Sequence, residues 1–265
     1  MRLIWLTDIH LDHLKDDDAQ SFCQRVNDSG PDNLLLTGDI SNGEKIEKHL
    51  KMIKKQISCP VYFVLGNHDF YKSSISEVNK LVEKITSKSK QLIWMDKSRA
   101  VKLSDTTALV GHSGFNDGRN GDYENSEYEP ADFYEIEEFK DISEEERLEL
   151  MKKLADESAD HIRKVLPEAC KTAPEVIMLT HVPPYSEACW FESEVTDKNH
   201  QPFFSSKAMG EAIHEVMADF PKTGLTVYCG HTHHSGEARI ADNIKVYTGA
   251  ATYGFPVAQR TFYIS

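Results

Sequence analysis

Cysteine is scarce in this sequence, and the cysteines lie far apart. The 265 residues contain five of them, with no C-x-x-C pair: Cys23, Cys59, Cys170, Cys189 and Cys229. This pattern excludes a disulfide framework and a zinc site built from clustered thiolates. We therefore expect small core residues at most of these positions and a reducing compartment.

Long apolar runs are also missing. No stretch approaches the roughly 18 to 20 apolar residues of a membrane span, and the first ten residues, MRLIWLTDIH, become acidic too soon for a secretory signal. We expect a soluble, cytoplasmic protein with no membrane partner. With 40% hydrophobic residues, the chain is able to bury a substantial core.

Basic residues are fewer than acidic ones, and the excess of acidic residues lies in one segment. The chain has 30 Lys and Arg against 43 Asp and Glu, a net charge of -13. Residues 121–160, the acidic lobe, hold 16 acidic and 4 basic residues, a local charge of -12, which leaves -1 for all other residues. Such a lobe repels phosphate backbones, so a nucleic-acid polymer is a disfavoured partner.

Short apolar runs alternate with segments of helical character. Strands are predicted at RLIWLT, NLLLTG, VYFVLG, TALVGH, EVIMLT, LTVYCG and IKVYTG. Helices are predicted near 16–27, 44–56 and 76–87. The early alternation indicates parallel strands, whereas the closely spaced strands within 226–265 are expected to be antiparallel. A mixed α/β layered fold follows.

Residues from about 115 to 171 depart from this alternation. A loop rich in Gly, Asp and Asn precedes a long amphipathic helix, in which Ser143 and Glu146 form a capping-box pattern and Pro167 is predicted to mark the end. We interpret this segment as an acidic helical insertion within a single domain that spans residues 1–265.

Polar residues follow five of the predicted strands. In α/β sheets, ligand sites form outside the carboxyl ends of the strands. Carboxylate, amide and imidazole ligands favour divalent Mn, Fe, Zn, Ni or Co. Seven candidate ligands are too many for one ion and suit two ions if one carboxylate bridges; they are Asp8, His10, Asp39, Asn67, His181, His231 and His233.

Spacing separates the clustered histidines of GHTHH. In extended backbone, residues two apart point to the same side, so Asp8 with His10 and His231 with His233 are expected to face one site. His234 would then point away and be a bystander.

Read in order, TDIH, TGDI, LGNHD, LTHVPP and CGHTH resemble the signature of the calcineurin-like metallophosphoesterases. The resemblance implies a four-layer α-β-β-α sandwich with two mixed β-sheets and a dinuclear metal centre. It implies that Asp8, His10, Asp39 and His233 hold one metal. Asp39 again, with Asn67, His181 and His231, would hold the other.

The same resemblance assigns catalytic roles. His68 matches the catalytic histidine of the family, and Asp69 is the acid that follows it. The block GDISNG lacks the arginine of the protein Ser/Thr phosphatases, and the pattern is closer to bacterial class III cyclic-nucleotide phosphodiesterases. We expect a phosphodiesterase or phosphomonoesterase acting on a small phosphoester.

In the expected mechanism, two cations share a solvent ligand as a bridging hydroxide that attacks phosphorus. His68 would protonate the leaving oxygen, and Asp69 would orient the His68 ring. Two alternatives are a metal-free scaffold of the same fold that binds proteins, and a nuclease.

Several other residues allow more than one interpretation. Arg119 would be a phosphate clamp or an ordinary loop arginine, and His112 a pocket residue or a surface cap. His13 is expected to be solvated. Aromatic side chains after His181, such as Phe191, would stack on a substrate ring or pack in the core.

Overall fold

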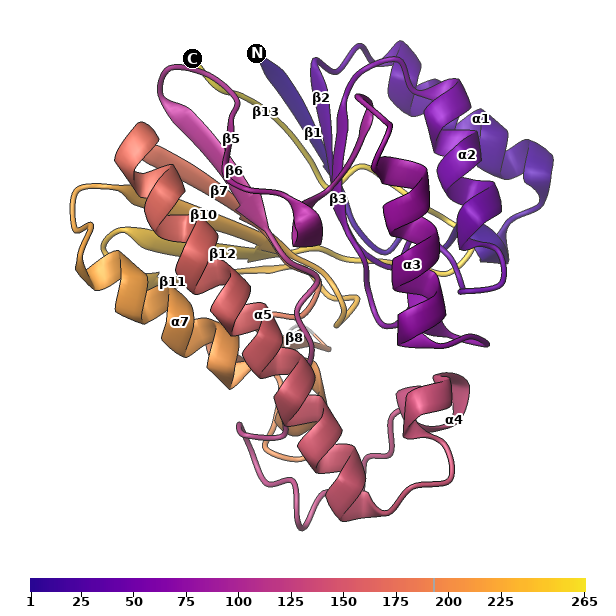
Figure 1. The fold of residues 1–265 in the computed structure, drawn as a ribbon, viewed down its shortest axis with the longest axis vertical. Coiled ribbons are helices and arrows are strands. Elements are labelled where there is room, and N and C mark those ends of the chain that lie inside the picture. Colours follow the sequence, from indigo (N-terminus) through magenta and orange to yellow (C-terminus); the bar gives the residue numbers. More distant parts are fainter. Residues whose placement is uncertain (193) are drawn as a thin grey trace.

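The computed structural model describes residues 1–192 and 194–265, which build two β-sheets with helices outside them (Figure 1). The first sheet has the order β13 (Arg260–Tyr263), β1 (Arg2–Leu6), β2 (Asn33–Thr37), β3 (Val61–Val64) and β4 (Leu92–Trp94). The second sheet has the order β11 (Gly236–Ala241), β12 (Ile244–Thr248), β10 (Gly224–Cys229), β7 (Glu175–Leu179), β6 (Thr107–Gly111) and β5 (Val101–Lys102).

The strands of the first sheet are parallel from β1 to β4, as the early alternation predicts. The connections are made by α1 (Asp16–Asp28), α2 (Ile46–Gln56) and α3 (Ile75–Thr86). The last strand, β13, pairs with β1 in the antiparallel direction, which brings the two ends of the chain together.

The prediction for 226–265 is wrong for β10 and β12, which are parallel to each other. Only the tight turn between β11 and β12 makes a hairpin there. The chain leaves β10, passes to the outer edge of the sheet to form β11, and returns as β12 between them. Turn residues in a sequence indicate which strands are joined by a short loop. They do not indicate the order of the strands across the sheet, which is decided by packing.

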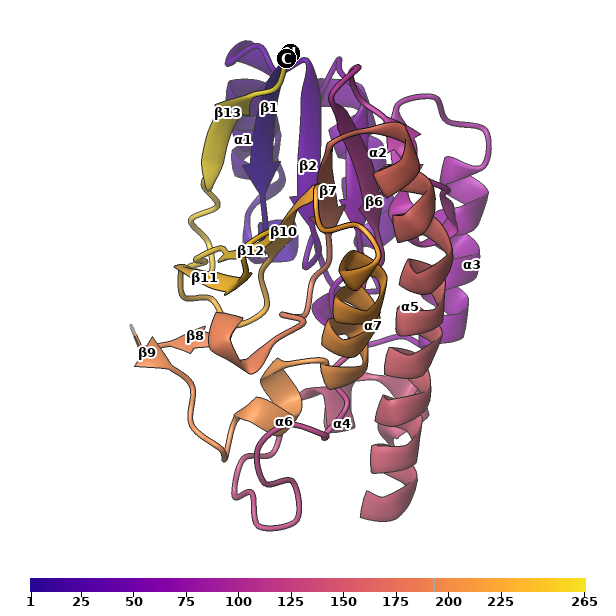
Figure 2. The ribbon, with the colours of Figure 1, turned by 90° about the vertical axis from the view of Figure 1, so that its left-hand side faces the viewer.

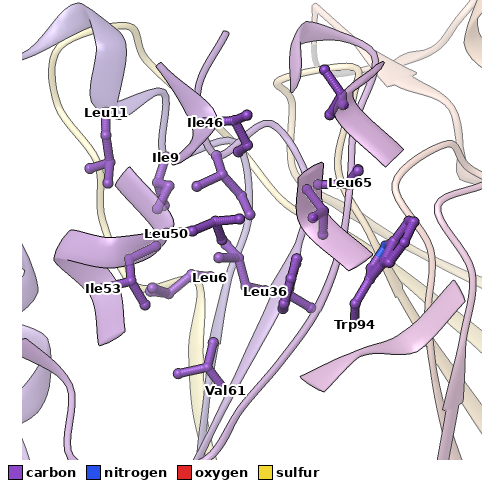
Figure 3. Packing of buried hydrophobic residues seen from close by; sticks show 14 of the residues in the cluster. Leu6, Ile9, Leu11, Leu36, Ile46, Leu50, Ile53, Val61, Leu65 and Trp94 are labelled. Atoms are coloured by element: carbon purple, nitrogen blue, oxygen red, sulfur yellow. The ribbon is translucent and has the colours of Figure 1, made fainter. Parts of the chain in front are cut away.

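The two sheets pack face to face. Leu3, Trp5 and Leu35 of the first sheet contact Ile177 and Leu179 of the second in one buried cluster. On the other side of the first sheet, the strand residue Leu36 meets Leu50 of α2 in a second cluster, part of which is drawn in Figure 3. Helices α5 (Glu144–Thr172) and α7 (Lys207–Ala218) cover the second sheet. The predicted four-layer α-β-β-α sandwich is confirmed.

Helix α5 begins with the predicted capping box of Ser143 and Glu146. It does not end at Pro167, which lies inside the helix. The residues beyond the proline, Ala169 and Cys170, pack in the core of the second sheet, and this burial keeps the last turn helical. Because α5 connects the parallel strands β6 and β7, its C-terminal half is a crossover helix. The acidic helical insertion at about 115–171 stays a prediction.

The smaller elements gather beyond the carboxyl ends of the strands. Figure 2 shows β1 and β2 pointing toward the part of the molecule that contains β8, α6 and α4. These elements are α4 (Asp132–Glu135), β8 (Trp190–Phe191), β9 (Glu194–Val195) and α6 (Gln201–Phe204). Short 3₁₀ turns are η1 (Leu11–His13), η2 (His68–Phe70), η3 (Met95–Lys97), η4 (Glu137–Phe139) and η5 (Ser186–Ala188).

The scarce cysteines behave as expected, because all five are buried and free. Within the described ranges, no helix has the length and apolar character needed to cross a membrane.

Candidate metal centre

The seven predicted ligands converge beyond β1, β2, β3, β7 and β10, but the backbone that carries them is not extended. Asp8, His10, Asp39, His231 and His233 have positive φ angles between 38° and 74°. The expected geometry of alternating extended residues is therefore wrong. Left-handed backbone at non-glycine residues costs about 1 to 3 kcal/mol each and is typical of functional loops.

The first half-site consists of Asp8, His10 and His233 together with Asp39. One ligand atom from each of these four residues lies within 4.8 Å of the others. The His10 and His233 Nε2 atoms are 3.2 Å apart, and His233 Nε2 is 3.3 Å from Asp8 Oδ1. Asp39 reaches this group through Oδ2, which is 3.8 Å from His10 Nε2.

The second half-site consists of Asn67, His181 and His231, again with Asp39. The Asn67 Oδ1 atom lies 3.0 Å from His181 Nε2 and 3.1 Å from His231 Nδ1. Asp39 reaches this group through its other oxygen, Oδ1, which is 3.4 Å from His181 Nε2. The carboxylate of Asp39 thus faces both half-sites.

Hydrogen bonds outside the second half-site fix which imidazole nitrogen faces inward. The His181 Nδ1–H donates to the carbonyl of Thr37 at 2.9 Å, and the His231 Nε2–H donates to the carbonyl of Phe203 at 2.9 Å. Burial lowers the pKa of His181, and it lowers the pKa of His231 to about 4, so both rings are neutral. Their remaining nitrogens carry lone pairs toward the centre.

This arrangement fits cations. Three lone-pair atoms of the second half-site point at one another with no proton to share. In the first half-site, the buried Asp39 Oδ2 atom has no hydrogen-bond partner among the described residues. Burial and then the negative charge of Asp8 raise the pKa of Asp39 well above its usual value. Buried carboxylates that repel one another are stabilised by a metal ion.

Asp132 is a site residue that the sequence analysis missed. This buried carboxylate begins α4, and its Oδ1 accepts from Asn67 Nδ2 at 2.7 Å and from the Tyr71 hydroxyl at 2.7 Å. Burial raises the pKa of Tyr71, so its hydroxyl keeps the proton that it donates. Asp132 thereby turns Asn67 Oδ1 toward the second half-site. Asp132 belongs to no strand-end motif. In the sequence it stands among many other acidic residues, so nothing distinguishes it from them.

Two motif glycines allow the ligand loops to approach each other. A Cβ atom at Gly66 would collide with the Asp39 carboxylate, and one at Gly230 would collide with the Asp8 carboxylate and the Thr7 hydroxyl. Any side chain at these positions would displace a ligand.

His68 lies beside the centre, as expected for a residue that follows a ligand. Its ring stacks on Tyr71, with centroids 4.1 Å apart, and lies 4.8 Å from the His10 ring. Burial lowers the pKa of His68 well below its ordinary value. Asp69 was predicted to orient this ring, but both of its carboxylate oxygens are hydrogen-bonded elsewhere. Its carboxylate accepts from the backbone amides of Ser41 and Gly66 at 2.8 Å and holds the loop instead.

The other candidate residues lie outside the two half-sites. Arg119 binds Asp156 through two hydrogen bonds of 2.7 and 2.8 Å, which makes it a structural loop arginine. His112 accepts from the Gly114 amide at 3.1 Å, a local capping role. His13 is half exposed and stacks on Tyr253.

A family model described as calcineurin-like phosphoesterase matches residues 1–235. The chain belongs to this family. As a calcineurin-like phosphoesterase it is a hydrolase of phosphoester bonds, and its buried Asp and His cluster fits the metal dependence of the family. No significant relative is found among curated proteins.

Solved structures support the fold of this phosphoesterase. The phosphopantetheinyl hydrolase from Mycobacterium tuberculosis is 13% identical, with a TM-score of 0.68 over 95% of this chain and 89% of the other. A dimetal phosphatase from Danio rerio is 14% identical, with a TM-score of 0.61 over 100% of this chain and 92% of the other. At these identities the similarity concerns the fold alone.

Proposed function

We propose that this phosphoesterase hydrolyses small phosphoesters with two divalent ions, one in each half-site, bridged by Asp39. The observation that carries the proposal is the position of the Asp39 carboxylate, with Oδ2 toward His10 and Oδ1 toward His181. The description of the similar Danio rerio structure as a dimetal phosphatase agrees with it.

Asp8, His10 and His233 would hold one ion, and Asn67, His181 and His231 the other. When bound, the ions would supply a water of lowered pKa and neutralise charge on the phosphoryl oxygens. The mixed oxygen and nitrogen ligands, with no thiolate, favour Mn, Fe, Zn, Ni or Co. The neutral imidazoles of His181 and His231 require no proton release when an ion binds at neutral pH.

We assign His68 to the leaving oxygen. Its ring lies beside the first half-site and lines the cleft that opens from the centre. A neutral imidazole retains one N–H, which is able to donate to an oxygen on which negative charge develops. Asp69 supports this residue indirectly, because its carboxylate fixes the loop that carries His68.

The first experiment is a metal and substrate panel. The chain is treated with EDTA, reloaded with Mn, Fe, Zn or Ni, and analysed for bound metal. It is then assayed on phosphomonoesters and phosphodiesters, cyclic nucleotides included. We expect two ions per chain and activity only after loading. A folded protein that takes up no divalent ion would overturn the proposal and favour a metal-free scaffold.

The second experiment tests His68. The His68→Ala variant should keep both ions and lose roughly 10²- to 10³-fold in kcat on an ester with an alkyl leaving group, on whose oxygen the most negative charge develops. The loss should be much smaller on a p-nitrophenyl ester, whose leaving oxygen shares its charge with the ring. Equal losses on the two esters would contradict the assignment of the His68 N–H to the leaving oxygen.

A nuclease is disfavoured by the acidic lobe, part of which lines the cleft through Tyr128 and Asp132. Linear single-stranded DNA should therefore remain intact with the metal-loaded protein. Rapid cleavage would reverse this judgement.

A further inference from the structure

A cleft of about 370 Å³ opens beside the metal centre. Asn67, His231 and His233 line it where it meets the two half-sites. Half of its other lining residues are Phe or Tyr, and we call this space the aromatic cleft; these six residues are Tyr71, Tyr128, Phe191, Phe203, Phe204 and Tyr253. A phosphoryl group alone does not require a space of this size.

The aromatic wall is assembled from segments distant in the sequence. Tyr128 precedes α4, Phe191 belongs to β8, and Phe203 and Phe204 belong to α6. The elements α4, β8 and α6 lie beyond the strand ends in Figure 2. Tyr128 packs against both α6 rings, with centroids 5.5 and 5.4 Å apart. Phe204 meets the ring of the ligand His231 edge to face at 5.7 Å. The wall is therefore continuous with the metal centre.

The charges around the aromatic cleft are as informative as its rings. Among the described residues that line it there is no Lys or Arg, and the one carboxylate is Asp132. The acidic lobe contributes Tyr128, Pro130, Ala131 and Asp132 to the wall. Apart from ions in the half-sites, no positive charge among the described lining residues would pair with a second phosphate. The acidic lobe beside the cleft would repel it.

We propose that the substrate is an ester with a single phosphate and an uncharged aromatic group that lies in the aromatic cleft. This inference rests on the proposed function, since the phosphate must be held at the half-sites. Flat aromatic groups stack on aromatic side chains and need no charged partner. Esters with further phosphates, such as nucleoside triphosphates, are poor substrates in this proposal.

The test uses three diesters that share an ethyl leaving group, which carries no ring. They are the ethyl esters of thymidine 5′-monophosphate, of the same nucleotide with an added 3′-phosphate, and of methyl phosphate. With the metal-loaded protein, kcat/KM for the thymidine ester should exceed each of the other two by about tenfold or more. Comparing the thymidine ester with the methyl ester measures the effect of the aromatic group. Comparing it with the 3′-phosphorylated ester measures the effect of the extra charge.

A variant of the wall completes the test. Tyr128→Ala should lower the ratio of kcat/KM for the thymidine ester to that for the methyl ester by about tenfold. The matched control Tyr263→Ala removes an exposed tyrosine on β13 and should leave both rates unchanged.

The possible failures are distinguishable. If all three diesters are hydrolysed equally well, or if the 3′-phosphorylated ester is preferred, the inference about the aromatic cleft is overturned and the proposed function stands. If no ester is hydrolysed with any of the metals, the proposed function fails and the inference fails with it.

Discussion

The two half-sites share Asp39 but are held in different ways. In the second half-site, each of the other ligands has an outer partner: the carbonyl of Thr37 for His181, the carbonyl of Phe203 for His231, and Asp132 for Asn67. In the first half-site, the buried His10 Nδ1 atom has no partner among the described residues, and the His233 side chain is 20% exposed.

The difference separates two ways of preparing a metal site. The first half-site carries more negative charge, because the carboxylates of Asp8 and Asp39 both face it. We expect its ligand side chains to become fully ordered only when an ion binds. The second half-site contains the neutral amide of Asn67 and is ordered by hydrogen bonds before an ion arrives. Outer partners of this kind are typically worth 10- to 100-fold in metal affinity.

The largest expected effect comes from the shared residue. Asp39→Ala removes both carboxylate oxygens, one from each half-site, so neither half-site keeps its full set of ligands. Both ions should be lost and kcat/KM should fall on the order of 10³-fold, equivalent to several kcal/mol of lost charge stabilisation. Metal analysis and steady-state kinetics check this. Loss of a single ion would show that Asp39 serves one half-site only.

The next effect should be confined to the second half-site. In Asp132→Asn, the new side chain presents an NH₂ group or a weaker acceptor to Asn67, so the orientation of Asn67 Oδ1 is no longer fixed. Affinity for one ion should fall roughly 10- to 100-fold while the other stays bound. Calorimetric titration of the EDTA-treated protein measures the two affinities separately.

Tyr71→Phe is the matched control for Asp132. It removes one donor to the carboxylate and a longer contact, 3.2 Å, from Asn67 Nδ2 to the hydroxyl, and leaves the shorter hydrogen bond between Asp132 and Asn67 in place. Its effect on metal affinity should be smaller than that of Asp132→Asn. If both variants weaken both ions equally, the contrast between the half-sites is wrong.

The smallest effect concerns acid stability without metal. Burial lowers the pKa of His49, which lies outside both half-sites, to about 4, compared with about 6.5 in an unfolded chain. Between these values the unfolded chain binds more protons, so the free energy of unfolding falls as pH drops from about 6.5 toward 4. His49→Gln should reduce the protons taken up on unfolding near pH 5 by about one. Urea titrations at several pH values measure this, and an unchanged slope would exclude His49.

The strand-end motifs made the centre predictable because each ligand lies two to four residues beyond the end of a recognisable apolar strand. The backbone conformation was not predictable in the same way. Positive φ at Asp8, His10 and Asp39 arises from hydrogen bonds between loops, such as that from the His10 amide to the Asp39 carbonyl. Those partners are separated in the sequence and leave no local pattern.

Asp132 and most of the aromatic cleft were missed for a related reason, although Phe191 was already a candidate to stack on a substrate ring. Asp132 is 65 residues from Asn67, in a segment where acidic residues are so common that no single one stands out. The bystander His234 was also underestimated, because it lines the aromatic cleft although it lies outside both half-sites. Which residues line a cavity is decided by the packing of β8, α6 and the loop before α4, and sequence periodicity does not encode that packing.

The pairing of β13 with β1 has a consequence for how the protein is made. The strand that carries Asp8 and His10 toward the site stays unpaired on one side until residues 260–263 emerge from the ribosome. A growing chain that ends before His233 also lacks a ligand. Most of the chain must therefore be translated before an ion is captured, and until then the exposed edge of β1 is open to wrong pairing.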